Sequence, residues 1–235
     1  MSKKVSLILC TYNEVNYIED TISLVSKTLK DVEIIIIDDN SNDGTLEKLE
    51  TLKSIFKFKL IIRKVEKGLA SAQKRGFEES TGEYIGTMDV NSKDQILYFE
   101  KLIEKLNEGY DIAVLSRYVL GGGDQRIFIR SFASKAINLV SKFLLRIPFN
   151  DFTSCIFLMK RKLIDHSAII KTGYAEWFIE FVYILYKKKY RLVEIPYVQK
   201  IDENLSLSKS YPNLFTFFYL GCIYFFRIIL ALIRN

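Results

Sequence analysis

The chain has 235 residues, of which 49% are hydrophobic and 26% charged, so it can bury a sizeable core and is not intrinsically disordered. Its formal net charge of +6 permits acidic lipid or phosphorylated partners, but the Lys and Arg residues are dispersed and no nucleic-acid motif is present, which argues against a nucleic-acid partner. The three cysteines lie far apart without CxxC spacing, so they indicate neither a disulfide framework nor a zinc site.

The first half of the chain alternates apolar strands with amphipathic helices. The predicted strands cover residues 5–10, 32–37, 58–62 and 83–88. The first helix, which carries apolar residues at helical spacing from Val15 to Leu29, is expected to be capped by Asn13. The strand–helix–strand order predicts an α/β fold with a mostly parallel sheet and right-handed crossovers.

The second half continues the pattern and ends in an apolar segment. Its predicted helices and strands cover residues 95–107, 110–115, 126–145, 152–159, 175–188 and 191–199. We expect one domain over residues 1–210, followed by a helical segment over residues 211–235. Arg227 interrupts the apolar run of this segment, which leaves a charge-free stretch shorter than the roughly 20 residues that span a bilayer.

Acidic residues follow two of the predicted strands. Asp38 and Asp39 end the second strand, and Asp89 ends the fourth. Ligands of open parallel sheets bind at the carboxyl ends of the strands, where a carboxylate can accept hydrogen bonds from a ribose or a base. The glycine-rich fingerprint of NAD and ATP sites is missing after the first strand, so the acids predict another kind of nucleotide site.

A series of short motifs runs through residues 4–210 in a characteristic order. The motifs are Thr11–Glu14 (TYNE), Ile37–Thr45 (IDDNSNDGT), Gly68-Leu69, Gly76, Thr81–Tyr84 (TGEY), Met88-Asp89, Ser116–Tyr118 (SRY), Arg130 with Ser134, Asp151–Ser154 (DFTS) and Glu194–Pro196 (EIP). Together they resemble the family-2 glycosyltransferases with the GT-A fold. The set is most similar to the dolichyl- or polyprenyl-phosphate mannose (hexose) synthases.

The resemblance implies a role for each matching residue. The residues implied to bind the nucleotide are Thr11, Tyr12, Glu14, Asp39 and Ser41. Asp89 would anchor the metal and the diphosphate of the donor. Arg117, Arg130 and Ser134 would hold the phosphate of the lipid acceptor, and two guanidinium forks suit a phosphate better than lysines do. The alternative is that both arginines form ordinary surface ion pairs.

The metal motif departs from the family pattern. The family has Asp-x-Asp-x-Gln, whereas this chain has Asp89, Asn91 and Lys93 at those three positions. Asn91 is a neutral oxygen ligand, and the ammonium of Lys93 repels a divalent cation. We therefore expect weakened binding of Mg²⁺ or Mn²⁺. Lys93 is expected to supply part of the positive charge that stabilises the leaving diphosphate. The alternative is that Lys93 faces solvent and the metal still binds through Asp89 and the phosphates.

A second departure falls in the predicted phosphate-gripping loop. The family has Arg-x-x-Gly-x-Ser-Lys, and here Glu203 replaces the arginine and Ser206 the glycine. Ser208 and Lys209 still match, so they are expected to contact the diphosphate or the acceptor phosphate. The reversed charge at Glu203 brings the usual donor, or efficient catalysis, into question.

The function implied by the resemblance is an inverting transfer of a sugar from GDP-mannose or a UDP-hexose to dolichyl or polyprenyl phosphate. This reaction needs no strong general base, because a phosphate monoester, with a second pKa of about 6, is largely dianionic near neutral pH. The alternatives are a family-2 enzyme with another acceptor and a non-catalytic homologue that only binds a nucleotide sugar.

A lipid acceptor implies a membrane partner, and the C-terminal segment fits one. On a helical wheel Arg227 and Arg234 share a polar stripe, and apolar residues cover most of the remainder. Residues 212–234 are therefore expected to lie in the membrane interface with the arginines towards the headgroups. A core-packed helix or the start of a membrane span are the alternatives. The expected location is peripheral, on the cytoplasmic face of a membrane.

Overall fold

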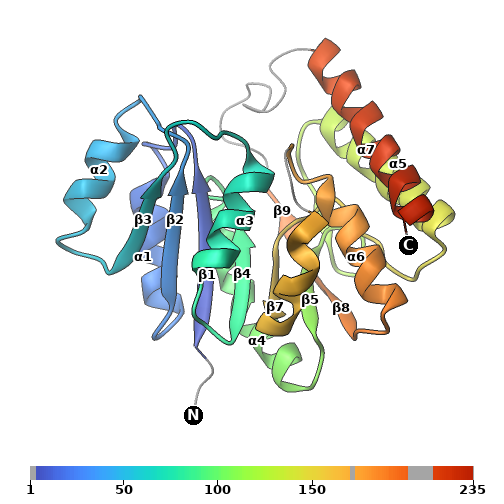
Figure 1. Ribbon diagram of the computed structural model, residues 1–235, viewed down its shortest axis with the longest axis horizontal. Coiled ribbons are helices and arrows are strands. Elements are labelled where there is room, and N and C mark those ends of the chain that lie inside the picture. Colours follow the sequence, from blue (N-terminus) through green and yellow to red (C-terminus); the bar gives the residue numbers. More distant parts are fainter. Residues whose placement is uncertain (1–3, 170–172, 201–213, 235) are drawn as a thin grey trace.

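The computed structural model describes residues 4–169, 173–200 and 214–234. Its main feature is a seven-stranded sheet in the order β3-β2-β1-β4-β7-β5-β8, beside a two-stranded ribbon of β6 and β9 (Figure 1). The strands are β1 Val5–Thr11, β2 Glu33–Asp38, β3 Phe58–Ile62, β4 Tyr84–Met88, β5 Ile112–Ser116, β6 Gly123–Asp124, β7 Phe157–Lys160, β8 Leu192–Pro196 and β9 Val198–Gln199.

The helices connect these strands as the sequence predicts. They are α1 Ile18–Thr28, α2 Thr45–Leu52, α3 Leu69–Glu79, α4 Phe99–Asn107, α5 Phe128–Leu145, α6 Trp177–Lys187 and α7 Leu214–Arg234, with 3-10 helices η1 Lys93–Tyr98 and η2 Arg161–Ile169. The expected cap of the first helix is wrong, since α1 begins at Ile18, after Tyr17. Asn13 instead has a left-handed φ of 58°, and its side-chain oxygen accepts the backbone N–H of Asn42 at 3.0 Å.

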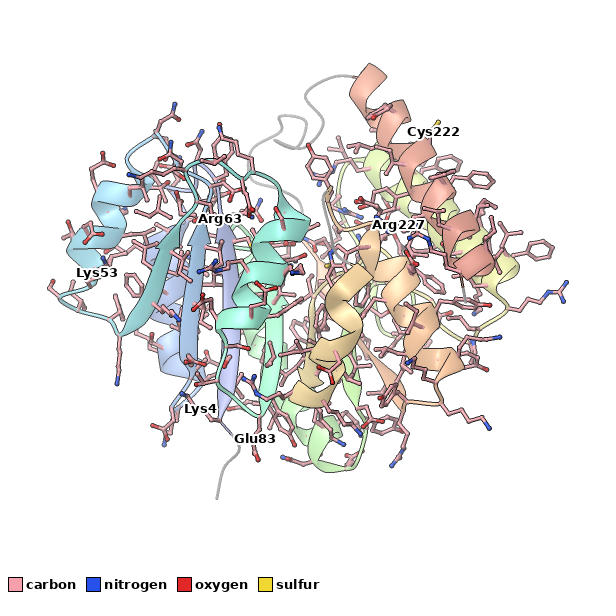
Figure 2. All side chains as sticks on the ribbon, in the orientation of Figure 1. Lys4, Lys53, Arg63, Glu83, Cys222 and Arg227 are labelled. Carbon is pink, nitrogen blue, oxygen red and sulfur yellow. The ribbon has the colours of Figure 1, made fainter. Side chains whose placement is uncertain are left out.

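Strand direction gathers the loops that matter at one edge of the sheet. β1 to β4 run parallel, and β5 runs parallel to β8, while β7 lies antiparallel between β4 and β5. The carboxyl ends of the parallel strands therefore share the upper edge in Figure 1, and β7 contributes its start to the same edge. Lys4 and Glu83, labelled in Figure 2, mark the opposite edge, where β1 and β4 begin.

Helices cover both faces of the sheet and divide the core in two. α1, α2 and α4 bury their apolar sides on one face, and α3, α5, α6 and α7 lie on the other. The close approach of α3 to β1 requires Gly76, because a Cβ at this position would lie 2.4 Å from the Ile8 side chain. The mixed α/β architecture with helices on both faces confirms the predicted fold class.

The C-terminal helix is present, but its polar stripe faces the wrong way for the expected interfacial helix. Arg227 forms an ion pair with Glu180 of α6 at 3.0 Å and approaches Glu176, which caps the start of α6, at 3.8 Å, and both acids are buried. Arg234 also reaches Glu180, at 3.7 Å. Arg227 therefore points into the molecule rather than towards headgroups, whereas the side chain of Arg234 is 53% exposed.

α7 packs against α5 and α6, and Ile228 and Ala231 join the main core. The predicted boundary at residues 210 and 211 lies outside the described residues, so the division of the chain stays a prediction. Within the described ranges, no helix combines the length and hydropathy of a membrane span.

Candidate active site

The loops after β1 and β2 are joined by hydrogen bonds at the carboxyl edge of the sheet. Thr11 Oγ1 and Ser41 Oγ each donate to the carboxylate of Asp38 at 2.7 Å, and the N–H of Asn13 donates to Ser41 Oγ at 2.9 Å. Asp38 is fully buried, and Thr11 and Ser41 are nearly so. Thr11 and Ser41, which are expected to bind the nucleotide, therefore stabilise the loops after β1 and β2.

Tyr12 and Glu14 lie in the same loop with more of their surface accessible. Tyr12 is 44% exposed, and the ammonium of Lys67 lies 5.5 Å from the centre of its ring. The backbone N–H of Glu14 donates to Thr45 Oγ1 at 2.9 Å, which ties the loop to the start of α2. Tyr12 therefore presents an exposed aromatic surface, and its expected contact with the nucleotide stays a prediction.

Asp39 is held by a buried arginine that the sequence analysis did not single out. Arg63 Nε and Nη2 lie 2.7 and 2.5 Å from Asp39 Oδ1, and the N–H of Gly68 donates to Asp39 Oδ2 at 2.7 Å. Arg63 also donates to Ser71 Oγ at 2.8 Å and to the Gly68 carbonyl at 2.9 Å. The position of Arg63 directly after a predicted strand is the sequence signal that could have found it.

Asp89 follows β4 at the middle of the sheet. Its N–H donates to Gln95 Oε1 at 3.0 Å, and Gln95 Nε2 donates to Asp89 Oδ2 at 3.3 Å, so the buried amide orients the carboxylate. Lys93 forms an ion pair with Asp20 of α1, and both side chains are about half exposed. The expected role of Lys93 at the diphosphate stays a prediction.

The described part of the chain contains no group of three or more His, Cys, Asp or Glu side chains arranged to hold a metal ion. Asp89 and Asn91 follow β4 closely and offer one carboxylate and one amide oxygen. Mg²⁺ is usually held by one or two carboxylates together with substrate phosphates. This donor set therefore fits a divalent ion that arrives with a diphosphate, and not a metal cage built from protein alone.

Arg117 follows β5 and is locked onto a buried carboxylate. Its Nε and Nη2 donate to the two oxygens of Asp151 at 2.8 and 2.6 Å, and Nη2 also donates to Thr153 Oγ1 at 2.8 Å. Burial alone would lower the pKa of Arg117, but the charge and hydrogen bonds of Asp151 outweigh it and hold the pKa well above its ordinary value. The guanidinium is therefore permanently charged and fixed in orientation.

Residues of α5 meet this pair from the other side. Ser134 Oγ lies 2.9 Å from Thr153 Oγ1, and Asn138 Nδ2 donates to the same hydroxyl at 2.9 Å. Arg130 lies four residues before Ser134 on α5, so the two share a side of the helix. Two of the three residues expected to hold the acceptor phosphate, Arg117 and Ser134, thus meet at Thr153, and Arg130 lies one helical turn before Ser134 near the start of α5.

A third guanidinium borders the group and was missed by the sequence analysis. Arg126 Nε and Nη2 donate to the two oxygens of Asp124 at 2.8 and 2.6 Å, and the hydroxyl of Tyr118 donates to Asp124 at 3.0 Å. Burial raises the pKa of Asp124, but Arg126 and Arg117 outweigh this and lower it to about 2. The position of Arg126, two residues after Asp124 in the glycine-rich loop, was the sequence signal that could have found it.

The EIP motif supports the arginine group from β8. The carboxylate of Glu194 accepts the N–H groups of Asn150 and Asp151, each at 2.9 Å. The pKa of Glu194 is raised by burial, although hydrogen bonds from Ser116 and Asn150 act in the opposite direction. Glu194 therefore fixes the loop that delivers Asp151 to Arg117.

Asp89 and Arg117 follow strands that end at the same edge of the sheet. The strands that carry them, β4 and β5, are separated only by β7, which corresponds to two interstrand spacings, or about 10 Å. Burial is the main cause that raises the pKa of Tyr197. The charge of Arg117 lowers this pKa, and the charges of Asp151 and Asp89 raise it. Ser208 and Lys209, which the sequence predicts to contact phosphate, lie outside the described residues.

The sheet with its reversed strand β7, the acids at the ends of β2 and β4, and the arginines beyond β5 together define a glycosyltransferase domain of the GT-A fold. Residues 6–167, more than half of the chain, match the sequence model of Glycosyl transferase family 2. The chain therefore belongs to glycosyl transferase family 2.

Named relatives agree with this assignment. The chain is 36% identical over 202 residues to the dolichol-phosphate mannosyltransferase of Pyrococcus furiosus, an alignment that covers 83% of this chain and 56% of that protein. It is 32% identical over 118 residues to the cholesterol galactosyltransferase of Borreliella burgdorferi, covering 50% of this chain and 33% of the relative. The chain thus spans between a third and little more than half of these relatives.

A solved structure supports the fold. The glucosyl-3-phosphoglycerate synthase of Mycobacterium tuberculosis, in complex with Mn²⁺, UDP-glucose and phosphoglyceric acid, superposes with a TM-score of 0.74 at 15% identity. The superposition covers 97% of this chain and 79% of that one.

Proposed function

We propose that the protein transfers a hexose, with inversion, from a nucleotide sugar such as GDP-mannose or a UDP-hexose to dolichyl or polyprenyl phosphate. The observation that carries this proposal is the position of Asp89 and Arg117 at the ends of β4 and β5, with only β7 between them. Asp89 follows β4, the neighbour of β1, whose loop carries the exposed Tyr12. The buried Arg117 shares Asp124 with the partly exposed Arg126.

The donor would bind over the loops after β1 and β2. Tyr12 supplies an aromatic surface for the base, and Asp39, oriented by Arg63, still has acceptor capacity for a base N–H or a ribose hydroxyl. Thr11, Glu14 and Ser41 hold these loops together through their hydrogen bonds. The UDP-glucose bound in the mycobacterial neighbour supports a nucleotide-sugar donor.

The acceptor phosphate would be held by Arg117, Arg130 and Ser134, with Arg126 completing the positive side. An oxygen of the phosphate attacks the anomeric carbon, a new carbon–oxygen bond forms, and the bond to the diphosphate breaks on the opposite side. Because the acceptor is already anionic, the arginines do not remove a proton. They align the attacking oxygen and screen its repulsion from the donor diphosphate.

A divalent ion that enters with the donor would be held by Asp89 and, more weakly, by Asn91. It would offset the charge that develops on the diphosphate. The Mn²⁺ in complexes of the mycobacterial neighbour supports such an ion. The chain's own contribution is the orientation of Asp89 by Gln95.

Metal dependence decides between the two roles considered for Lys93. Transfer would be measured in a chelator and with added Mg²⁺ or Mn²⁺. Strict dependence on the metal would show that Lys93 does not replace it, whereas residual transfer in the chelator that is lost in Lys93→Gln would assign this charge to Lys93.

Transfer itself is tested with purified protein, radiolabelled GDP-mannose, UDP-glucose and UDP-GlcNAc, and dolichyl phosphate in detergent. Label extracted into the organic phase supports the proposal. Asp89→Asn should reduce the rate by about 100-fold or more, since it removes a charged group at the reacting centre. The matched control is Glu50→Gln, an exposed carboxylate of α2 that pairs only with the neighbouring Lys53 in the contacts of the described residues.

The same assay, run also with phosphoglycerate as the acceptor, separates the alternatives. Transfer to soluble phosphoglycerate, and none to dolichyl phosphate, would indicate a family-2 enzyme with another acceptor. Binding of the nucleotide sugar without any transfer would indicate a non-catalytic homologue, which the substitutions at Asn91 and Lys93 make a meaningful second candidate. Because the acceptor is a lipid, we propose that the protein acts as a peripheral protein on the cytoplasmic face of a membrane, with residues 212–234 at the contact.

A further inference from the structure

Two neighbouring helices turn apolar sides away from the molecule. On α5, Phe128, Phe132, Leu139 and Phe143 are between 63% and 83% exposed. At 100° per residue these four positions fall within an arc of about 60° on the helix. The rings of Phe128 and Phe132 stack at 5.9 Å between centroids, so they form one continuous surface.

α7 continues this surface. Tyr219, Phe226 and Ile233 are 59%, 60% and 75% exposed and repeat every seven residues, so they too share one side of their helix. Figure 2 shows Arg227 on the side of α7 that faces α6 and Cys222 on the opposite side. α5 and α7 pack against each other, and both lie at the end of the molecule opposite α2 (Figure 1).

The charged residues of α5 and α7 are all basic. Neither α5 nor α7 contains an aspartate or a glutamate. Lys135 and Lys142 are exposed, and their spacing puts them beside the apolar arc of α5, while the exposed Arg146 follows at the end of the helix. The acids that neutralise Arg227 lie on the inner side, on α6. The outer surface is therefore apolar and basic.

We propose that the outer sides of α5 and α7 form a single docking surface for an anionic lipid bilayer, with α5 as an equal partner of the C-terminal helix. Soluble proteins rarely expose apolar patches of this kind without a partner. Lysines are depleted in protein–protein interfaces, whereas aromatic residues flanked by lysines are typical of helices that lie in the headgroup region of a bilayer.

This surface deepens the proposed function and rests on it for the substrate that the bilayer carries. The inner side of α5 presents Ser134 and Asn138 to Thr153, which also receives Arg117. A helix is about 10 Å across, and an interfacial helix sinks its apolar side about 5–10 Å into the headgroup boundary. The inner side of α5 would then lie level with the phosphates of the lipid, where an acceptor phosphate meets the arginines.

The test uses the full chain and vesicles that contain neither polyprenyl phosphate nor nucleotide sugar. Sedimentation would be measured with phosphatidylcholine vesicles and with vesicles that also contain phosphatidylserine. Phe132→Ser with Phe143→Ser should lower the partition coefficient at least about tenfold, because two exposed rings no longer enter the bilayer. Lys135→Gln with Lys142→Gln should lower binding about fivefold per lysine, on the anionic vesicles only.

The matched control is Ile55→Ser with Leu97→Ser, which removes two exposed apolar side chains elsewhere on the molecule and should leave binding unchanged. Unfolding in urea confirms that each variant is folded. The proposal is overturned if the wild-type chain does not sediment with anionic vesicles, or if the phenylalanine variant binds as well as the wild type. A dimer that dissociates in the phenylalanine variant would identify the surface as a protein interface instead.

This experiment fails independently of the transfer assay. Transfer to acceptor in detergent with no vesicle binding would retain the proposed function and reject the docking surface. Vesicle binding without transfer would retain the docking surface and reject the proposed function.

Discussion

Buried ion pairs dominate the arginine side of the site at the scale of single residues. Arg117 and Asp151 are 5% and 0% exposed, and each is the main charge partner of the other. Taking two charges out of water costs several kcal/mol, which their attraction recovers only while both are present. The pair therefore fixes the direction of the guanidinium rather than adding much to net stability.

A double-mutant cycle tests this view of the pair. Arg117→Met and Asp151→Asn should each lower the free energy of unfolding by about 3–5 kcal/mol, because each leaves an uncompensated buried group. The double variant should cost clearly less than the sum of the two, as measured by urea unfolding. Additive losses would show that the two groups do not act as a pair.

Asp124 gives the site a signature at acid pH. Its pKa is lowered to about 2 in the folded protein, so the stability it contributes is fully present above the ordinary value of 3.8 and is lost as the pH falls from about 4 to about 2. The shift corresponds to about 2 kcal/mol. Asp124→Asn should therefore flatten the decline in unfolding free energy over this range relative to the wild type.

Urea unfolding at pH 7, 4 and 2.5 measures this effect. Glu50→Gln, an exposed control, should follow the wild-type decline. An Asp124→Asn profile parallel to that of the wild type would contradict the assignment of this charge to Arg126 and Arg117.

At the scale of elements, two glycines in helices have opposite roles. In α3 a Cβ at Gly76 would lie 2.4 Å from Ile8, whereas in α7 no atom lies within 4 Å of a Cβ at Gly221. Gly76 allows α3 to approach β1 closely. This contact positions the loop before α3, in which the N–H of Gly68 donates to Asp39.

Alanine at these two positions should change stability in opposite directions. Gly76→Ala should destabilise the protein by about 1–3 kcal/mol through overpacking. Gly221→Ala should leave stability unchanged or raise it by up to about 1 kcal/mol, because alanine has the higher helix propensity. Thermal and urea unfolding of the two variants measure both effects, and equal losses would refute the packing argument.

At the scale of the whole molecule, buried acids of α6 hold α7 in place. Glu176 and Glu180 are 2% and 1% exposed, and Arg227 reaches both. Glu176 also accepts the N–H of Tyr174, and the adjacent Gly173 carbonyl accepts the N–H of Ala70 in α3. Loss of the α7 contact would therefore disturb a turn that contacts the start of α3.

Two arginine variants test the attachment of α7. Arg227→Met should cost about 3–5 kcal/mol and expose α7 to proteolysis, because it leaves two buried carboxylates without their main cation. Arg234→Met, whose side chain is 53% exposed, should stay within about 0.5 kcal/mol of the wild type. Equal resistance of both variants to protease would argue against this contact as the anchor.

The sequence alone determined the order of the elements, because apolar periodicity and turn residues are local signals. It also determined that Asp39, Asp89 and Arg117 follow strands, since the ends of apolar runs can be read directly. Parallel strands then imply a shared edge, and the structure has these residues on it. The family resemblance rested on the same local motifs, and the family is confirmed.

Only the tertiary structure decided which partners those side chains meet. Arg63 reaches Asp39 across 24 positions, and Arg117 reaches Asp151 across 34, so no local pattern predicts either pair. The helical wheel placed Arg227 and the apolar stripe on opposite sides of α7, but it could not say which side faces the protein. That choice depends on buried carboxylates of α6, because a charge is stable inside a protein only where an opposite charge meets it.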